Sequence, residues 1–550
     1  MTTDAANNGP KIPPPAGNVS VDPARRRNRL VAASIGLLAL VGGVVFALTR
    51  LNGQDTSALV AVPDDVHIVF SMDLYQVVRS DGINSLVSAF AEPMAAAGYV
   101  DEAEIDLAES IASELEEELG VDLEEDILSW MGRSLAFGVW FPAGALDPIP
   151  TEFVAGPDPD VVAVVSVTDP ARAAAFLEGL DEFVSSAPFE DGESYRFAEM
   201  DGGVVWLGDD LMVLATSEEI LSKSLEARGG TSIVESKTFD DVASRLPADR
   251  LMTGYLSTDF FGLLAEAAAL GEAQAGFPGI DDVLGLGFSV SLIDAGLRFD
   301  AVQVLSEAAS SPPASGEIRA VAALPAETVG FFAGVIPEGA IAEAVASFRD
   351  LDPEAYDEML GQMSLDLGVD IEADLLPSIG GEALLAVVPD TAGAIAVEGG
   401  VDIGILISLG LIEAGPMGDL LSALELLLSE EMGLAVVQGT PIQLMGEDQV
   451  LAAYELREDS LVLGSSAEVV NGFVAGDGGV TETEVYRQLD AELPGAGLAF
   501  YVNVPRVLDL IDMSPEDRAI AEPVKGIGAS SSQEGTVLTS SIIILIDYLP

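Results

Sequence analysis

Apolar runs separated by short polar turns recur along the chain from residue 59 onward. Four of them open with an apolar residue followed by Pro, at Val62, Leu246, Leu324 and Leu493. Each continues through two or three small or polar residues into an apolar run and then a helix-like tail. Because proline cannot donate to a β-ladder and fixes its own φ, it fits best just before a strand. The pattern therefore predicts four places at which a strand leads into a helix.

The periodicity predicts the same order of elements twice. Strands that alternate or are continuously apolar are expected at 66–72, 135–141, 161–167, 285–293 and 296–305, and again at 328–334, 383–388, 403–408, 526–531 and 536–546. Helices are expected within 170–184 and 418–428, and an acidic amphipathic helix at 101–120. A hairpin with a Gly-Asp-Asp turn is expected at 203–216, with a second hairpin at 451–465. Ser217 and Ser466 are the expected N-caps of the helices that follow.

Ungapped similarity relates the two halves. Residues 119–139 align with 367–387 at an offset of 248, and 209–221 align with 458–470 at an offset of 249. The prolines after Val62 and Leu324 align at an offset of 262. The predicted fold class is α+β: two tandem homologous units, 59–306 and 318–550, with mainly antiparallel sheets and packed helices. A Pro/Ser-rich linker at 307–317 separates the two units.

The first fifty residues predict a membrane anchor. Residues 1–29 are expected to be a disordered cytoplasmic tail that ends in four arginines, and residues 50–58 a short linker. Between them, residues 30–49 are uncharged, and twenty residues at about 1.5 Å each span about 30 Å, the thickness of a bilayer core. The arginines favour a cytoplasmic N-terminus and an extracytoplasmic remainder. A cleaved signal peptide is the alternative, but a small-x-small cleavage site is poorly matched after Phe46.

The acidic composition limits the partners. The chain has 23 Lys plus Arg against 91 Asp plus Glu, a formal net charge of −68. Such a surface repels phosphate backbones, so nucleic-acid binding is excluded, and it suits a salty exterior or basic partners. The absence of cysteine excludes thiol catalysis, disulfides and Cys-ligated zinc.

An anchor followed by recurrent "LPAD"-type starts and apolar strands resembles a bacterial family of membrane-anchored extracytoplasmic proteins of unknown function. The resemblance covers about residues 59–550. It implies no activity, and it identifies no functional residues.

Catalytic, metal-binding and cofactor-binding motifs are absent from the sequence. The one histidine, His67, lies among apolar residues of a predicted strand and is interpreted as structural rather than as part of a triad. The acidic run 101–126 lacks a calcium-loop pattern, and 91 acids make carboxylate pairs uninformative. Trp130, Trp140 and Trp206 are expected in the core. No cofactor is expected.

These observations predict a non-enzymatic binding or interaction protein of the bacterial envelope, held at the membrane by residues 30–49. The expected partners are the bilayer, and an unidentified envelope protein or hydrophobic ligand. One alternative is a carrier that holds a lipid in a strand-lined groove, because residues 537–549 form a long apolar run interpreted as buried on both faces. Another is a carboxylate-dependent hydrolase, which would need a deep pocket with clustered acids.

Overall fold

A computed structural model describes most of the chain beyond residue 55. The described residues are 56–73, 89, 123–142, 159–180, 183–198, 202–270, 282–306, 318–351, 353–393, 402–431, 434–445, 450–476, 478–493, 497–511 and 513–547. The predicted tail (1–29), anchor (30–49), acidic helix (101–120) and linker (307–317) therefore lie outside the described residues. Of the acidic run 101–126, residues 123–126 are described. Within the described part of the chain, no helix is both long and apolar enough to cross a membrane.

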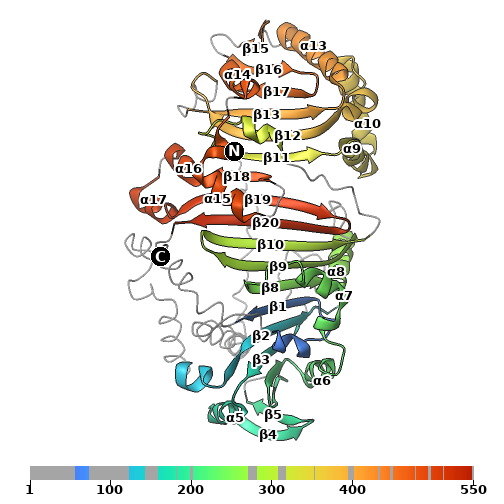
Figure 1. Ribbon diagram of the computed structural model, residues 1–550. Helices are drawn as coiled ribbons and strands as arrows, with labels where there is room; N and C mark the ends of the chain where they lie inside the picture. Colours follow the sequence, from blue (N-terminus) through green and yellow to red (C-terminus); the bar gives the residue numbers. More distant parts are fainter. Residues whose placement is uncertain are drawn as a thin grey trace, which may run out of the picture.

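One antiparallel sheet of 20 strands runs through the described residues (Figure 1). The predicted fold class, two tandem α+β units with mainly antiparallel sheets and packed helices, is therefore wrong, because one sheet runs through both halves. Strands that were expected to end each unit pair with each other instead, and this pairing joins the two halves into a single sheet. We call β1–β10 the N-terminal half of the sheet and β11–β20 the C-terminal half.

Pairing gives the two halves the same strand order. In the N-terminal half the successive neighbours are β4 (Phe183–Phe189), β5 (Gly192–Phe197), β6 (Val204–Leu207), β7 (Leu211–Ala215), β3 (Asp160–Val167), β2 (Met131–Trp140), β1 (Ile68–Asp73), β8 (Arg250–Ser257), β9 (Val283–Ile293) and β10 (Gly296–Leu305). In the C-terminal half they are β14 (Ala435–Val437), β15 (Ile442–Met445), β16 (Val450–Leu456), β17 (Ser460–Gly464), β13 (Ile403–Leu411), β12 (Ile379–Pro389), β11 (Gly330–Ile336), β18 (Phe500–Asn503), β19 (Val524–Glu534) and β20 (Val537–Ile546). The halves meet at β10 and β20.

The junction has an approximate two-fold axis. Asp300 is the fifth residue of β10, Ser541 is the fifth residue of β20, and the two are directly paired. Equivalent residues pair with each other in antiparallel strands only where a two-fold axis passes between them. The Oγ of Ser541 donates a hydrogen bond of 2.6 Å to Oδ1 of Asp300, and both side chains are buried.

Helices and short helical turns pack on the sheet or beside it. They are η2 (Ser57–Ala61), η4 (Leu123–Leu128), α5 (Pro170–Gly179), α6 (Glu218–Ala227), η5 (Ile233–Glu235), α7 (Lys237–Ala243), α8 (Thr258–Leu270), η8 (Arg319–Ala323), α9 (Ala340–Leu351), α10 (Pro353–Leu367), η9 (Ile371–Leu375), α11 (Leu376–Ser378), α13 (Ala414–Glu431), α14 (Ala467–Ala475), η10 (Val480–Glu482), α15 (Glu484–Glu492), α16 (Val504–Leu510) and α17 (Pro515–Ala521). The expected N-caps are confirmed, because Ser217 Oγ accepts from Ile220 N and Ser466 Oγ accepts from Val469 N.

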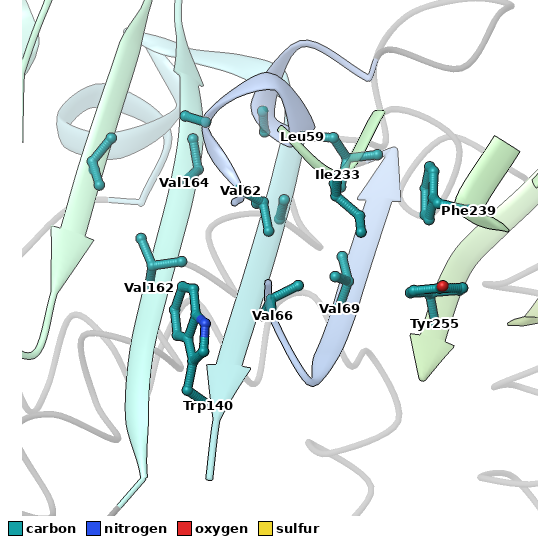
Figure 2. Packing of buried hydrophobic residues seen from close by; sticks show 14 of the residues in the cluster. Leu59, Val62, Val66, Val69, Trp140, Val162, Val164, Ile233, Phe239 and Tyr255 are labelled. Carbon is teal, nitrogen blue, oxygen red and sulfur yellow. The ribbon is translucent and has the colours of Figure 1, made fainter. Parts of the chain in front are cut away.

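The first face of the sheet, which we call the closed face, carries Val69, Tyr255 and Val302 in the N-terminal half and Leu384 and Tyr501 in the C-terminal half. Two apolar clusters bury it, under η2, α6, η5 and α7 in one half and under η8, α14, η10 and α15 in the other. Figure 2 shows the first cluster, in which Val62, Val66 and Val69 pack beside Trp140 and Ile233. Fully burying a side chain of this size stabilises the fold by roughly 1.5–3 kcal/mol.

The opposite face, which we call the open face, is covered only toward its two ends among the described residues. At one end η4 and α5 cover Leu135 and Val165, and at the other η9 and α13 cover Leu411 and Leu461. Between these clusters the strands present apolar side chains that are partly exposed.

Two hairpins and one helix boundary differ from the sequence-based expectation. The β4–β5 and β14–β15 hairpins were not predicted, because they are short edge elements and β4 is largely exposed and contains Pro188. The helix expected through residue 184 ends at Gly179, and Phe183 and Val184 begin β4. An edge strand with little buried surface carries little hydrophobic pattern by which to recognise it.

Candidate functional site

A continuous row of apolar side chains crosses the open face. Directly paired residues of antiparallel strands project from the same face, so successive pairs define a row across the sheet. The apolar row consists of Met72, Met252, Val290, Phe299, Ile542, Ala529, Phe500, Phe332, Leu385, Ile407 and Leu463. It passes over the junction between the halves at Phe299 and Ile542, which pair directly.

The middle of the apolar row is exposed to an unusual degree for large apolar residues. Phe332 is 60% exposed, Ile542 46%, Leu385 45%, Ile407 38% and Phe299 37%. Single exposed apolar residues are normal on protein surfaces, but a contiguous set on one face indicates an interaction site.

The row is hollowed in the C-terminal half. A shallow hollow of about 500 Å³ is lined by Phe332, Ala333, Gly334, Ala383, Leu384, Leu385, Ile407, Ser408, Leu409, Ala499 and Phe500. A second hollow of about 220 Å³ lies beside it and shares Ile407. Ser408 is the one residue with a polar side chain among the described residues that line the larger hollow. We call the larger one the Gly334 hollow, because a Cβ added at Gly334 would meet no atom within 4 Å.

Matched positions in the N-terminal half are filled. Phe70 pairs with Phe137 as Phe332 pairs with Leu385, and Met72 pairs with Leu135 at the positions that Gly334 and Ala383 hold in the other half. Leu135 is 0% exposed and packs in a core cluster beneath η4 and α5. The larger side chains Met72 and Leu135 thus occupy the space that glycine and alanine leave open in the C-terminal half.

An aromatic pair borders the hollow. The rings of Phe332 and Phe500, on neighbouring strands, lie 4.7 Å apart at 46°. In the N-terminal half the corresponding pair is Phe70 and Phe288, 6.0 Å apart and edge to face. There the strand between them carries Gly254, over which the ring of Phe288 lies. The two halves therefore build an aromatic pair at the same place from different strands.

His67 is a structural residue by its contacts. It lies just before β1 rather than inside it, and its Nδ1 accepts a hydrogen bond of 2.8 Å from the backbone N–H of Phe141. Its ring stacks on the ring of Phe141 with centroids 6.3 Å apart. Burial lowers the pKa of His67, against the opposing effect of the carboxylates Asp259 and Asp65. The backbone N–H of Ser257 in turn donates a hydrogen bond of 3.0 Å to the carbonyl oxygen of His67.

Acidic side chains form neither a metal site nor a pocket lining among the described residues of this site. Within the described ranges, no group of three or more His, Cys, Asp or Glu side chains is placed to hold a metal ion. The described lining of the Gly334 hollow contains no carboxylate. The hydrolase alternative, which needs clustered acids in a pocket, therefore finds no support in this site.

The sequence-based interpretation missed the site, although the alignment contained its signal. The offset of 262 that aligns the first two prolines also places Gly334 opposite Met72, and the offset of 248 places Ala383 opposite Leu135. Loss of side-chain volume at two paired positions of one half predicts a hollow there. The apolar run 537–549 was interpreted as buried on both faces, but in β20 one face is buried while Ile542 is on the open face. The three tryptophans are buried, as predicted.

The chain belongs to a protein family, because the model described as "Protein of unknown function (DUF3352)" matches residues 31–546. No curated protein matches. Among solved structures, crystal forms III and IV of TP0453 cover 46% of this chain and 81% of their own. They are 10% and 9% identical, with TM-scores of 0.25 and 0.24, and a likeness this small carries no argument about fold or function.

Proposed function

We propose that this member of the DUF3352 family is a non-enzymatic binding protein that seats the apolar chain of a ligand in the Gly334 hollow. The observation that carries the proposal is the hollow itself: an apolar depression in one half of the sheet, at positions that the other half fills with Met72 and Leu135.

Size and lining both favour a hydrocarbon ligand. A volume of about 500 Å³ falls within the range of about 300–1,000 Å³ that is usual for small-molecule sites. Moving one methylene group from water into such a site contributes about 0.8 kcal/mol. The side chains of the described lining that project from the open face are all apolar, because Ser408 pairs with Leu384 of the closed face, so the seated part of the ligand is held by contact with apolar atoms rather than by hydrogen bonds.

A peptide fits this surface less well than a hydrocarbon. Each non-proline peptide residue brings an N–H and a C=O that must keep a hydrogen-bond partner when they are buried. Phe332, Leu385 and Ile407 lie inside the sheet, on strands whose backbone groups already pair with neighbouring strands on both sides. A hydrocarbon chain has no such groups, so its burial leaves no polar atom unsatisfied.

We further propose that residues 30–49 hold the protein at the membrane, with the sheet on the extracytoplasmic side. Support comes from the sequence alone: twenty uncharged residues preceded by four arginines. A protein held at a bilayer lies close to a source of long-chain ligands.

Extraction of the purified full chain with organic solvent, followed by mass spectrometry, tests the binding function. Gly334→Met introduces the side chain that the equivalent position already carries. Gly472→Met, on an exposed position of α14 where an added Cβ also meets nothing, is the matched control. We expect the wild type and Gly472→Met to retain the same apolar-chain compound in near-equal amounts, and Gly334→Met to lose most of it. Equal amounts in all three, or none in the wild type, would contradict the proposal.

A further inference from the structure

We propose that the ligand is a single hydrocarbon chain markedly longer than an ordinary acyl chain, and that it lies along the apolar row from the Gly334 hollow across the junction to Phe299. This inference rests on the proposed binding function and adds the class and the path of the ligand.

The length follows from the strand spacing. From Ile407 through Leu385 and Phe332 to Phe500 the row crosses three spacings of about 4.8 Å, or about 14 Å. From Ile407 to Phe299 it crosses six spacings, or about 29 Å. The hydrocarbon core of a bilayer is about 30 Å thick and holds two layers of chains, so one ordinary acyl chain is about 15 Å long. The part of the row beside the hollow, about 14 Å, is as long as one such chain, and the row from Ile407 to Phe299, about 29 Å, is as long as two of them.

Among the described residues, a hollow lies at one end of this path. The hollow lies at the C-terminal end, whereas Met72 and Leu135 fill the matched positions beyond Phe299 and Val290. A ligand that is held in the hollow therefore covers Ile542 and Phe299 only if its own chain reaches them. Two short ligands placed end to end would leave the second one without a depression to hold it.

A second copy of this chain is a poor occupant of the same face. Each copy carries a formal net charge of −68, so two copies brought face to face repel each other. An uncharged hydrocarbon chain meets no such repulsion. It also needs no hydrogen-bond partner along the row, where Ala529 and Ile542 continue the apolar surface between Phe500 and Phe299.

The test compares two uncharged probes that differ only in length, palmitoyl glycerol and hexacosanoyl glycerol. The full chain is kept soluble in a fluorinated surfactant, whose chains mix poorly with hydrocarbon. Ile542→Ser alters the far part of the row, and Ser540 on the same strand and face shows that a serine is accommodated there. Gly334→Met fills the Gly334 hollow with a side chain, and Gly472→Met is the control.

We expect the wild type to bind one hexacosanoyl glycerol at least about tenfold more tightly than palmitoyl glycerol, because the longer chain buries further methylene groups. Ile542→Ser should remove about that advantage and leave palmitoyl glycerol binding unchanged. Equal affinity for both probes, or two palmitoyl glycerols bound per chain, would overturn the long-chain inference but would leave the proposed binding function of the Gly334 hollow intact. If Gly334→Met changes the binding of neither probe, the proposed function itself fails. Thermal unfolding of each variant confirms that it is folded.

Discussion

Ser541 donates a hydrogen bond to Asp300 across the junction of the two halves, and the two residues hold the same position in their respective strands. Arg298, two residues before Asp300 in β10, also donates to Oδ1 of Asp300 at 2.9 Å. The second carboxylate oxygen, Oδ2, is buried without a hydrogen-bond partner among the described residues. A buried carboxylate that needs its partners penalises other registers of this strand pair, in addition to the buried apolar face.

Ser541→Ala should lower the free energy of unfolding by about 1–3 kcal/mol, because it removes a hydrogen bond to a buried carboxylate. Denaturant titration measures the change. Ser540→Ala, one residue earlier and on the open face, is the control and should stay within about 0.5 kcal/mol of the wild type. Equal effects of the two substitutions would show that the contact at the axis does not stabilise the junction.

Leu135 and Ala383 hold matched positions, and exchanging their sizes should destabilise the protein by unequal amounts. Leu135→Ala should destabilise the protein by about 2–5 kcal/mol, since it opens a cavity beneath η4 and α5. Ala383→Leu should cost less than about 1 kcal/mol, because it extends into the Gly334 hollow. Calorimetric or denaturant unfolding of both variants measures this difference. A loss of more than about 1 kcal/mol in Ala383→Leu would mean that the hollow does not have room for the side chain.

His67 should titrate below pH 6.5. Burial lowers its pKa from 6.5 in the folded chain, so the unfolded chain binds the proton first as the pH falls. The contribution of His67 to stability is therefore complete above pH 6.5 and is lost as the pH falls from 6.5 toward the folded pKa. Protonation of Nδ1 also breaks the hydrogen bond from Phe141 N.

The chain has one histidine, so its ring signals can be followed by NMR without assignment. Asp259→Asn should lower the pKa of His67 further, because the charge of Asp259 raises it. His67→Gln should abolish the part of the pH dependence of stability that falls between pH 6.5 and the folded pKa. A measured pKa above 6.5 would show that the neighbouring carboxylates outweigh burial.

The proposed topology predicts a protease result. Protease added to intact spheroplasts should digest the chain beyond about residue 51 and spare a tag placed before residue 25. Opening the cells with detergent beforehand is the control, and it should expose the tag as well. Protection of the large region in intact spheroplasts would reverse the orientation.

Elements that depend on local pattern could be predicted from the sequence, and elements that depend on distant pairing could not. The hairpin β6–β7 and the caps at Ser217 and Ser466 follow from turn chemistry within a few residues, and the structure confirms them. The pairing of β10 with β20 joins residues 241 apart at Asp300 and Ser541, and nothing in either segment alone specifies that partner. The hydrophobic periodicity of the sequence therefore could not predict that both halves share one sheet.

The candidate site depends on side-chain volume rather than on chemical type. Gly334 and Ala383 have no chemistry that marks them as functional, and only their comparison with Met72 and Leu135 shows that space is left. A search for titratable residues and motifs passes over such a site, because the feature is what the side chains lack.

Photocrosslinking tests the central claim most directly, that the Gly334 hollow seats a hydrocarbon chain. An uncharged lipid with a diazirine on its acyl chain is irradiated with the full chain, and the labelled peptides are mapped by mass spectrometry. We predict labelling of the strands around Phe332 and Phe500, little labelling around the matched Phe70 and Phe288, and loss of the label in Gly334→Met but not in Gly472→Met. Equal labelling of both halves, or labelling that Gly334→Met leaves unchanged, would contradict the account.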